Sequence, residues 1–489
     1  MDKAIIINEN DNVAVALCDL KKGDSFGNIT LKTDVPEKHK LALKDIPAGE
    51  KVIKYGFPIG IATENIKAGE HIHTHNLKTA LTESEDYIFK GDFIYSPHKS
   101  DLTFHGFLRD NGKVGIRNRI FVIPTVGCAN KTAVDIAKKA TSLLGITDNT
   151  VCALTHPYGC SQLGDDADNT AKCLAALCKH PNAGGALLVS LGCENNNLDN
   201  MSHFLGDYDT NRIRTLNMQE CDDEIAEGVE IIKSIYAITK NDKRTEQPIE
   251  KLTVGFKCGG SDGFSGITAN PLCGKICDKL TSVKAKTILT EVPEMFGAET
   301  RLTERSINEN VFKSCVEMIN GFKKYFTDHG QVVYENPSPG NKDGGITTLE
   351  EKSLGCITKG GFSVVTDVLG LYRPCKKSGL SLLWGPGNDI VSTTNLTCAE
   401  ASVILFTTGR GTPLGAPVPT IKISTNSSLY QKKKSWIDFN AGTLLEGETF
   451  EDAEKNLLKL IIDVADGKKT LNELNGYEEI AIFKDGIIL

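Results

Sequence analysis

From residue 104 onward, the chain repeats one pattern: an apolar run, a glycine-containing loop and then a helical segment. For example, "RNRIFVIPTVGC" precedes the amphipathic stretch "KTAVDIAKKATSLLG", and "VCALTHPYGC" precedes "DDADNTAKCLAALCKH". Parallel strands need long crossover connections, which are usually helices that cover the sheet. The pattern therefore predicts an α/β fold with mostly parallel sheets. A charged segment at 238–251 favours a first α/β lobe at 104–240 and a second at 251–489, although one large unit also fits.

Residues 1–78 follow a different pattern, in which short apolar or alternating segments are separated by tight turns such as "KKGD", "IPAGE" and "IKAGE". Such spacing is typical of short strands, so this region is predicted to be a small β domain. Residues 79–103 have a mixed polar composition and no clear period. We interpret them as a linker between the β domain and the α/β region.

Charge and hydropathy exclude several classes of partner. The net charge of −8 gives no support for binding to nucleic acid or to an anionic membrane surface. No apolar stretch approaches the roughly 20 residues that span a bilayer. The first residues carry acidic and Asn side chains where a signal peptide would have a basic flank and a long apolar core. We therefore expect a cytoplasmic protein that acts on a small molecule, and the sequence leaves open whether it forms a homo-oligomer.

The segment "HIHTHN" places three of the ten histidines within five positions. On an extended strand, His71, His73 and His75 would point to the same side. Neutral imidazole is the commonest metal ligand and suits iron, manganese or zinc. The alternative is a polar strand end with solvated histidines. We expect all three to be metal ligands, with His73 also a candidate for proton transfer.

Several loops that follow apolar runs contain a cysteine directly after glycine. Ligands of parallel sheets bind at the carboxyl ends of the strands, where such loops lie, and thiolates hold iron, zinc or iron–sulfur clusters. The alternative is that small residues pack closely beside glycine. His156 and Glu194 lie in the same loops and are candidate catalytic groups. The loops after the apolar runs contain Cys128, Cys160, Cys193 and Cys258, of which the first three are the candidate thiolate ligands.

Two later loops suggest how an anionic substrate is bound. "NPSPGNKDGG" is rich in Asn and Lys between glycines, and "TTGRGTPLG" places an arginine between two glycines. Neither the P-loop lysine motif nor G-x-G-x-x-G occurs, so nucleotide binding is rejected. Lys342 is a candidate catalytic cation. The candidate substrate-binding residues are Arg117, Asn336, Asn341, Arg410 and Thr412.

Taken together, the motifs "HIHTHN", "GKVGIRNRIFVIPTVGC", "HPYGCSQLGDD", "LGCENN", "CGGSDGFSGITANP", "LTEVPEMFGAE" and "FTTGRGTP" resemble those of the altronate dehydratase and galactarate dehydratase family. The resemblance runs from about residue 10 onward and is closest to the altronate branch. It implies an N-terminal SAF (β-clip) domain joined to an α/β dehydratase region. It also implies dehydration of D-altronate to 2-dehydro-3-deoxy-D-gluconate in hexuronate catabolism, with a divalent metal as cofactor, Fe²⁺ first and Mn²⁺ as the alternative.

The resemblance does not assign the catalytic residues, so their predicted roles rest on their chemistry. Dehydration of a sugar acid removes the proton next to the carboxylate, and cations stabilise the charge that develops there. Arg410 and Lys342 are predicted to supply that charge. The alternatives are a dehydratase for an aldarate such as galactarate, a lyase for another hydroxy acid such as sulfolactate, and a binding protein without catalysis.

Overall fold

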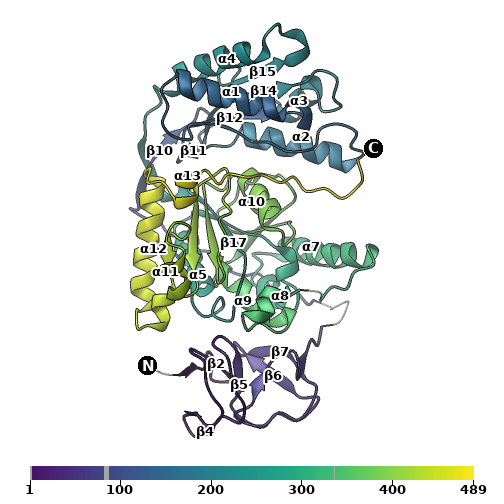
Figure 1. The fold of residues 1–489 in the computed structure, drawn as a ribbon, viewed down its shortest axis with the longest axis vertical. Helices are drawn as coiled ribbons and strands as arrows, with labels where there is room; N and C mark the ends of the chain where they lie inside the picture. The colour runs from purple at the N-terminus through teal and green to yellow at the C-terminus, as the bar shows by residue number, and fades with distance from the viewer. Residues whose placement is uncertain (1–2, 82–86, 335, 489) are drawn as a thin grey trace.

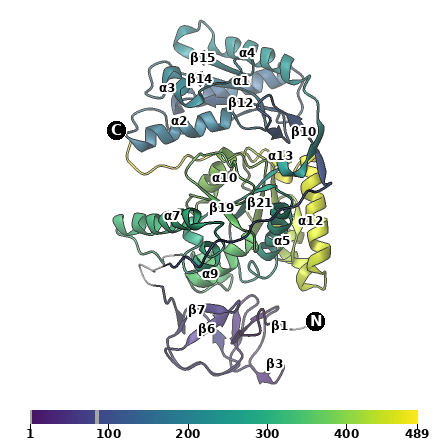
Figure 2. The ribbon, with the colours of Figure 1, turned by 180° about the vertical axis from the view of Figure 1, so that it is seen from behind.

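The computed structural model describes residues 3–81, 87–334 and 336–488. The described chain forms three regions stacked along its longest axis (Figure 1). The N-terminal β region lies at one end, a region built around a seven-stranded sheet lies in the middle, and a region with a four-stranded parallel sheet lies at the other end. The view from behind shows the same order (Figure 2). The region that comes last in the sequence therefore lies between the other two and contacts both of them.

The N-terminal region consists of short antiparallel strands joined by turns, which confirms the predicted β domain. One sheet has the order β1-β2-β5-β8 and a second has the order β6-β7-β9, beside the hairpin β3-β4. The strands are β1 (Ala4–Ile5), β2 (Val13–Ala16), β3 (Ser25–Phe26), β4 (Ile29–Thr30), β5 (Lys40–Ala42), β6 (Lys51–Lys54), β7 (Phe57–Ala62), β8 (His71–Ile72) and β9 (Leu77–Lys78).

The second region is a four-stranded parallel sheet in the order β13-β12-β14-β15, flanked by the antiparallel strands β11-β10-β16. Alternate residues of β12 face opposite layers, as a strand requires: Phe121 and Ile123 pack with α2 and α3, whereas Ile120 and Val122 pack with α1 and α4. The elements are β10 (Thr103–Leu108), β11 (Val114–Gly115), β12 (Arg119–Pro124), α1 (Asn130–Leu143), β13 (Val151–Ala153), α2 (Asp165–Cys178), β14 (Ala183–Ser190), α3 (Leu198–Leu205), β15 (Ile213–Asn217), α4 (Glu224–Thr239) and β16 (Thr245–Pro248).

The middle region contains a seven-stranded sheet in the order β19-β20-β18-β17-β21-β22-β23, in which every pair is parallel. Its strands are buried almost throughout, as expected for a sheet covered on both faces. The strands are β17 (Thr253–Cys258), β18 (Lys286–Leu289), β19 (Val365–Leu369), β20 (Gly379–Leu383), β21 (Val403–Thr408), β22 (Thr420–Ser424) and β23 (Phe439–Asn440). The helices are α5 (Ala269–Ser282), α6 (Thr300–Thr303), α7 (Glu309–Asp328), α8 (Pro339–Asp343), α9 (Leu349–Ile357), α10 (Asp389–Cys398), α11 (Ser427–Lys432), α12 (Phe450–Ala465) and α13 (Leu471–Asn475). Together, the two parallel sheets confirm the α/β prediction.

The strand order of the middle sheet reverses at β17. The chain first adds β18, β19 and β20 on one side of β17 and then crosses to add β21 and its neighbours on the other. Such a reversal opens a crevice at the carboxyl ends of the strands, where ligands of open α/β sheets bind. The loops after β17 and β21, which contain Asp262 and Arg410, meet there: Gly409 and Arg410 both donate their backbone N–H groups to the Gly260 carbonyl.

The described part of the predicted linker has no regular secondary structure between β9 and its last residue, Thr103, where β10 begins, and it packs along the middle region. The Tyr95 hydroxyl donates to the Thr281 carbonyl (2.9 Å), and the His98 N–H donates to the Ser282 carbonyl (2.8 Å). Residues 82–86 of this predicted linker lie outside the described residues.

The C-terminal segment after α13 returns to the second region. The backbone N–H groups of Asp485 and Gly486 donate to the two carboxylate oxygens of Asp166, at 2.9 and 2.7 Å. Asp166 belongs to the first turn of α2, and Ile488 forms a bridge with Gln162 just before that helix. This strap joins the two α/β regions. Among the helices of the described residues, none is both long and apolar enough to cross a membrane.

Candidate functional site

Four histidines of the N-terminal region form one group where this region meets the middle region. β5 pairs antiparallel with β8, with Leu41 opposite His71, and this pairing brings His39 beside His71 and His73. The ring centroid of His39 lies 5.1 Å from that of His71 and 4.7 Å from that of His73. The ring centroid of His75 lies 5.3 Å from that of His71. His39 was not predicted, because its place in the group depends on a strand pairing between distant parts of the sequence.

The local structure of "HIHTHN" differs from the predicted extended strand. Only His71 and Ile72 are in a strand, and the chain then turns, with the Asn76 side chain accepting the His73 N–H at 3.0 Å. The three predicted histidines still gather, but the turn and the pairing with β5 bring them together, not the alternation of a strand.

The histidine group has the properties of a metal-binding set. Burial and neighbouring imidazoles lower the pKa of His71 to about 3, and burial and the charge of Lys40 lower that of His73 to about 4, so both rings are neutral near pH 7. His39 Nδ1 and His71 Nε2 are 3.0 Å apart, close to the separation of about 3 Å between adjacent ligands whose bonds to a metal are about 2.1 Å. His73 Nδ1 lies 3.0 Å from Thr347 Oγ1, a contact that orients the ring and leaves Nε2 for a ligand. Neutral imidazoles of this kind suit a divalent transition metal, and His39 and His71 place two donors next to each other. The described structure does not hold three donor atoms of this group within 4.8 Å of one another.

The histidine group lies against the segment that begins at α8. His39 Nε2 is 3.4 Å from the Asp343 carbonyl, and the Lys38 carbonyl approaches two glycines of the middle region. A Cβ atom at Gly263 or Gly345 would lie 2.1 or 2.3 Å from this carbonyl oxygen. These two glycines are therefore required for the close contact between the two backbones.

A buried ion triad fixes this contact. Lys40 of β5 and Lys54 of β6 both bind Glu351 of α9, at 2.9 and 2.8 Å, and all three side chains are almost fully buried. Burial opposes ionisation of Glu351, but the two ammonium groups outweigh it and bring its pKa to about 2. Lys40 also donates to Thr347 Oγ1 at 2.8 Å, next to His73. The triad thus positions the histidine group on the middle region.

Cations with free donors lie at the same crevice. Arg410 is exposed and donates to the Gly340 carbonyl at 3.1 Å, which is the one hydrogen bond of its side chain within the described residues. Lys342 is half-buried, and its ammonium has no hydrogen-bond or ion-pair partner there. Gly340 and Asp343 are three positions apart in α8, or about 4.5 Å of helix rise. Because Arg410 contacts the first and His39 the second, α8 connects Arg410 to the histidine group.

Asp262, which was not predicted, anchors this crevice. Its carboxylate is buried, accepts from Thr425 Oγ1 (3.0 Å) and Ser265 Oγ (3.2 Å), and pairs with Lys38 at 3.3 Å. Its oxygens are therefore occupied, which favours a positioning role. The segment "CGGSDG" belongs to the motifs that resemble the family, but a local pattern does not contain the partners of its aspartate.

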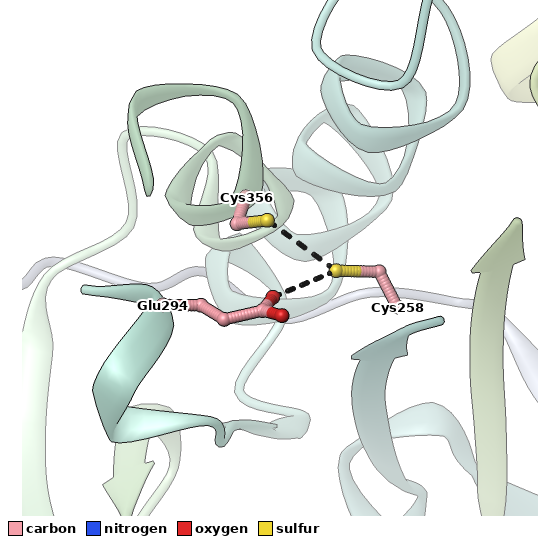
Figure 3. Close-up of side chains that lie close together, drawn as sticks. All are labelled: Cys258, Glu294 and Cys356. Atoms are coloured by element: carbon pink, nitrogen blue, oxygen red, sulfur yellow. Dashed lines mark hydrogen bonds between the residues drawn. The ribbon is translucent and has the colours of Figure 1, made fainter. Parts of the chain in front are cut away.

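A second polar cluster lies deeper at the ends of β17, β18 and β20. Cys258 Sγ lies 3.1 Å from Glu294 and 3.4 Å from Cys356 Sγ (Figure 3). Within the described residues, this is the one group of three potential metal-ligand atoms that lie within 4.8 Å of one another. However, Lys359 Nζ is 2.7 Å from Cys258 Sγ, and Lys352 is 2.7 Å from Glu294. Since these ammonium groups already occupy the donors, the cluster fits an ion-paired network better than a metal site.

The charges in this deep network balance. Its three lysines, Lys257, Lys352 and Lys359, meet three carboxylates. Lys257 contacts Glu291 and lies 2.9 Å from Asp389, and Lys359 is 3.2 Å from Glu291. A lysine inside the apolar run "LTVGFKC" was the sequence signal that could have identified this network.

A cavity of about 880 Å³ opens beside the crevice, between the N-terminal region, the linker and α5. Its volume is within the range of small-molecule sites. Tyr55 and Gly266 line both this cavity and a small pocket bordered by Asp262 and Lys352. The cavity and the small pocket therefore share a wall formed by these two residues.

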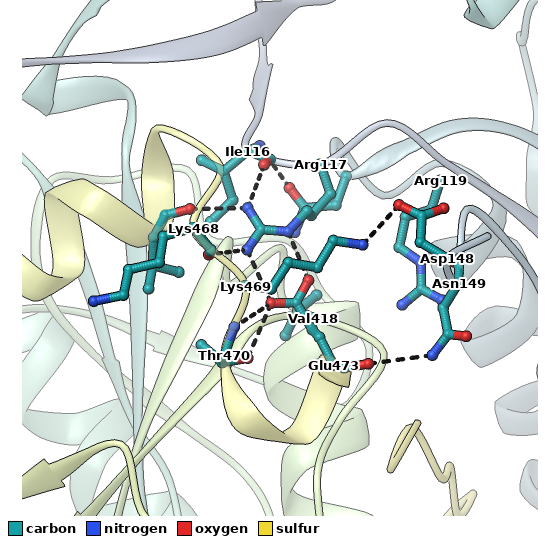
Figure 4. Close-up of polar contacts among 12 residues, drawn as sticks. Ile116, Arg117, Arg119, Asp148, Asn149, Val418, Lys468, Lys469, Thr470 and Glu473 are labelled. Atoms are coloured by element: carbon teal, nitrogen blue, oxygen red, sulfur yellow. Dashed lines mark hydrogen bonds and ion pairs between the residues drawn. The ribbon is translucent and has the colours of Figure 1, made fainter. Parts of the chain in front are cut away.

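The structure corrects the predicted role of Arg117. Its guanidinium is buried, pairs with both oxygens of Glu473 and donates to the carbonyls of Ile116, Val464 and Lys468 (Figure 4). No donor is left for a substrate, so Arg117 holds α12 and α13 to the second region.

Three other predicted substrate-binding residues are engaged within the protein. Asn341 is buried, caps α8 and donates to the Ser261 carbonyl at 2.9 Å, which makes it a structural residue. The Asn336 side chain accepts from Lys352 at 3.0 Å, and Thr412 Oγ1 accepts from the Leu414 N–H at 3.2 Å. Of the predicted substrate-binding residues, Arg410 has the most free donors.

The remaining predicted residues lie in the second region, at the far end of the molecule from the histidine group (Figure 1). Cys128, Cys160 and Cys193 therefore do not complete one metal shell with His71, His73 and His75. His156 and Glu194 are buried and engaged. Both ring nitrogens of His156 have backbone partners, Pro124 and Tyr158, and Glu194 accepts from Thr125, Ser190, Leu191 and Gly192. This saturation corrects their predicted catalytic roles to structural ones.

Comparison with known proteins gives three consecutive family matches. Residues 2–80 match the altronate/galactarate dehydratase SAF domain, 106–240 match the second domain of D-galactarate dehydratase/altronate hydrolase, and 249–488 match the C-terminal region of D-galactarate/altronate dehydratase. The chain is 48% identical to altronate dehydratase of Bacillus subtilis over 100% of both chains, and 48% identical to that of Escherichia coli over 99% of both. It is 33% identical to the L-threo-forming galactarate dehydratase of Escherichia coli, over 98% of this chain and 96% of the relative.

Proposed function

Because this chain belongs to the altronate/galactarate dehydratase family and is therefore a sugar-acid hydro-lyase, we propose that it converts D-altronate to 2-dehydro-3-deoxy-D-gluconate and water in hexuronate catabolism. The observation that carries this choice of substrate is the 48% identity to two altronate dehydratases along essentially the whole chain, against 33% to a galactarate dehydratase. The fifteen cysteines, all of them free, fit the reducing cytoplasm as the compartment of this reaction.

The substrate binds in the crevice at the carboxyl ends of β17 and β21. Its carboxylate contacts Arg410 and Lys342, cations that keep free donors within the described part of the chain. As the proton next to the carboxylate leaves, negative charge spreads onto the carboxylate oxygens, and these cations stabilise it. The histidine group closes the crevice from the side of the N-terminal region.

His39, His71 and His73 hold the proposed divalent ion, with His75 at the exposed rim of the group. The borderline softness of imidazole fits Fe²⁺, with Mn²⁺ as the alternative. When bound, such an ion polarises substrate oxygen atoms as a Lewis acid. Thr347 orients the His73 ring, and Lys40 and Glu351 hold the strands that carry the group.

A substrate panel tests the proposed reaction. Purified enzyme is incubated anaerobically with altronate, galactarate and sulfolactate, and the 2-keto-3-deoxy acid product is measured for each. We expect the highest kcat/KM with altronate. A higher value with galactarate would move the proposal to the aldarate branch, and sulfite release from sulfolactate without product from either sugar acid would overturn it.

The metal proposal has a separate test. Chelation should abolish turnover, and anaerobic addition of Fe²⁺ or Mn²⁺ should restore it. Full turnover by protein shown to be metal-free by elemental analysis would contradict the role of the ion without affecting the choice of substrate.

A further inference from the structure

The carboxyl edge of the second-region sheet presents one cysteine after each of its four strands. Cys160, Cys128, Cys193 and Cys221 follow β13, β12, β14 and β15, which is also the order of these strands across the sheet. Adjacent strands are about 4.8 Å apart. The topology therefore gathers these four residues, which are separated in sequence, along one edge.

Hydrogen bonds join the loops that contain the first three cysteines. The Gly127 N–H, beside Cys128, donates to the Tyr158 carbonyl at 2.8 Å, and the Asn196 N–H donates to the Gly159 carbonyl at 3.0 Å. Cys160 Sγ itself lies 3.6 Å from the Asn195 side chain, two residues after Cys193. The Cys128 loop thus contacts the Cys160 loop, which contacts the Cys193 loop.

Cys128 and Cys193 are not core-packing residues, whereas Cys160 packs partly against the cluster formed with α1 and α4. Nine of the fifteen cysteines are buried, whereas Cys128 and Cys193 are exposed and Cys160 is half-buried. The saturated hydrogen bonds of His156 and Glu194 hold the loops beneath them in place. A base of satisfied hydrogen bonds beneath at least partly accessible thiols suits a metal centre, whose ligands are held in place by their surroundings.

We propose that Cys128, Cys160 and Cys193 bind a [4Fe–4S] cluster at this edge, as a site separate from the histidine group and independent of the proposed function. Each thiol releases its proton to solvent and forms one iron–sulfur bond, and the core contains two ferrous ions, two ferric ions and four sulfides. With three thiolates, one iron of the cluster keeps a position open to a small oxygen ligand.

The spacing favours a cluster over a single ion. The three thiols come from loops after three adjacent strands, and they are not among the three donors that lie within 4.8 Å of one another in the described residues. A cluster separates its ligands more widely, as loops from three adjacent strands do.

Cys221 is excluded from the ligand set by its own contacts. Its thiol donates to the Asn217 carbonyl at 3.1 Å. Burial and then Glu227 raise its pKa to about 11, which keeps it protonated. It therefore provides a matched control at the same edge, with Cys18 as an exposed control in another region.

The test uses the full chain, reconstituted anaerobically with ferrous and ferric iron and sulfide. Bound iron and acid-labile sulfide are measured, together with Mössbauer spectra and the far-ultraviolet circular dichroism of each variant. Wild type, Cys221→Ser, Cys18→Ser and His71→Ala should each bind close to four iron and four sulfide at this site. Cys128→Ser, Cys160→Ser and Cys193→Ser should each lose most of the sulfide while keeping the wild-type dichroism.

A second measurement does not depend on any variant. In the reconstituted wild type, alkylation followed by mass spectrometry should show Cys128, Cys160 and Cys193 protected relative to the unreconstituted protein, while Cys18 is modified equally in both. Binding without acid-labile sulfide, retention of sulfide in the three variants, or equal alkylation of the three cysteines in both forms would each overturn the proposal.

Discussion

Most N–H groups of the Arg410 guanidinium are free, because its side chain makes one hydrogen bond within the described residues, to the Gly340 carbonyl. If it binds the substrate carboxylate, Arg410→Ala should lower kcat/KM by about 100-fold, the scale of one lost transition-state charge contact. Arg410→Lys should recover part of the loss, because it restores the charge but not the forked geometry. Steady-state kinetics on altronate and the melting temperature provide the measurement.

Arg214 is the matched control for this experiment, because it is exposed on β15 at the far end of the molecule. Arg214→Ala should leave kcat/KM unchanged. Near-parental kinetics of Arg410→Ala would place the substrate elsewhere, with the 880 Å³ cavity beside α5 as the next candidate.

Substitution of His39 is the most stringent test of the histidine group, because this residue was not predicted from the sequence. His39→Ala should reduce the Fe²⁺ bound after anaerobic loading by a factor of at least about ten, the scale of losing one ligand contact or more. His203→Ala, on an exposed position of α3, should bind as much metal as the wild type. Elemental analysis of the two proteins decides the outcome, and equal metal contents would remove His39 from the ligand set.

At the scale of elements, the joint between the strands of the N-terminal region and α9 depends on one ionised carboxylate. The pKa of Glu351 is held at about 2, below its ordinary value of 4.5, so the stability it contributes is fully present above pH 4.5 and is lost as the pH falls toward 2. Glu351→Gln should destabilise the protein by about 3–5 kcal/mol near neutral pH, because Lys40 and Lys54 are left as unpaired buried charges. The difference from wild type should shrink below pH 4.5.

Urea unfolding of wild type and variant at a series of pH values measures this difference. The adjacent Glu350 is the control, because burial raises its pKa instead. As the pH falls through the raised pKa of Glu350, wild type should gain stability relative to Glu350→Gln, the opposite direction from Glu351→Gln. A constant difference between Glu351→Gln and wild type across this range would show that the carboxylate charge does not hold the joint.

The secondary-structure elements could be predicted from the sequence more completely than the residues of the candidate site. The alternation of apolar runs and amphipathic stretches depends on local periodicity, so the β region and the two parallel sheets could be predicted. Arg117 and Arg410 both follow glycine-containing segments, yet one is buried against Glu473 and the other is exposed. What separates them is a partner 356 residues away in sequence, and no local pattern contains that information.

The whole molecule is held together at the histidine group by non-covalent contacts that a separate chain could also make. These include the Lys40–Glu351 and Lys54–Glu351 pairs and the hydrogen bond from Thr348 Oγ1 to the Ile59 carbonyl. A protein that lacks residues 1–81 should be inactive, because it lacks the histidines. Addition of a separate 1–81 chain should restore dehydration of altronate in a saturable manner.

The same fragment with His71→Ala is the control. It should compete with the wild-type fragment for binding, as measured by titration calorimetry, but should not restore turnover. Full activity of the truncated protein alone would show that the histidine group is outside the active site.

The contact of the C-terminal strap with Asp166 also has a consequence for biosynthesis, because its two partners are synthesised at different times. Asp166 precedes Asp485 by 319 residues, and ribosomes add about 5–20 residues per second, so roughly 16–64 s separate the synthesis of the two partners. During that interval, the nascent second region emerges from the ribosome and folds while the Asp166 carboxylate, in the first turn of α2, lacks the backbone N–H groups of Asp485 and Gly486. Slow translation of the middle region would therefore lengthen the time for which this part of the newborn chain is exposed to chaperones and proteases.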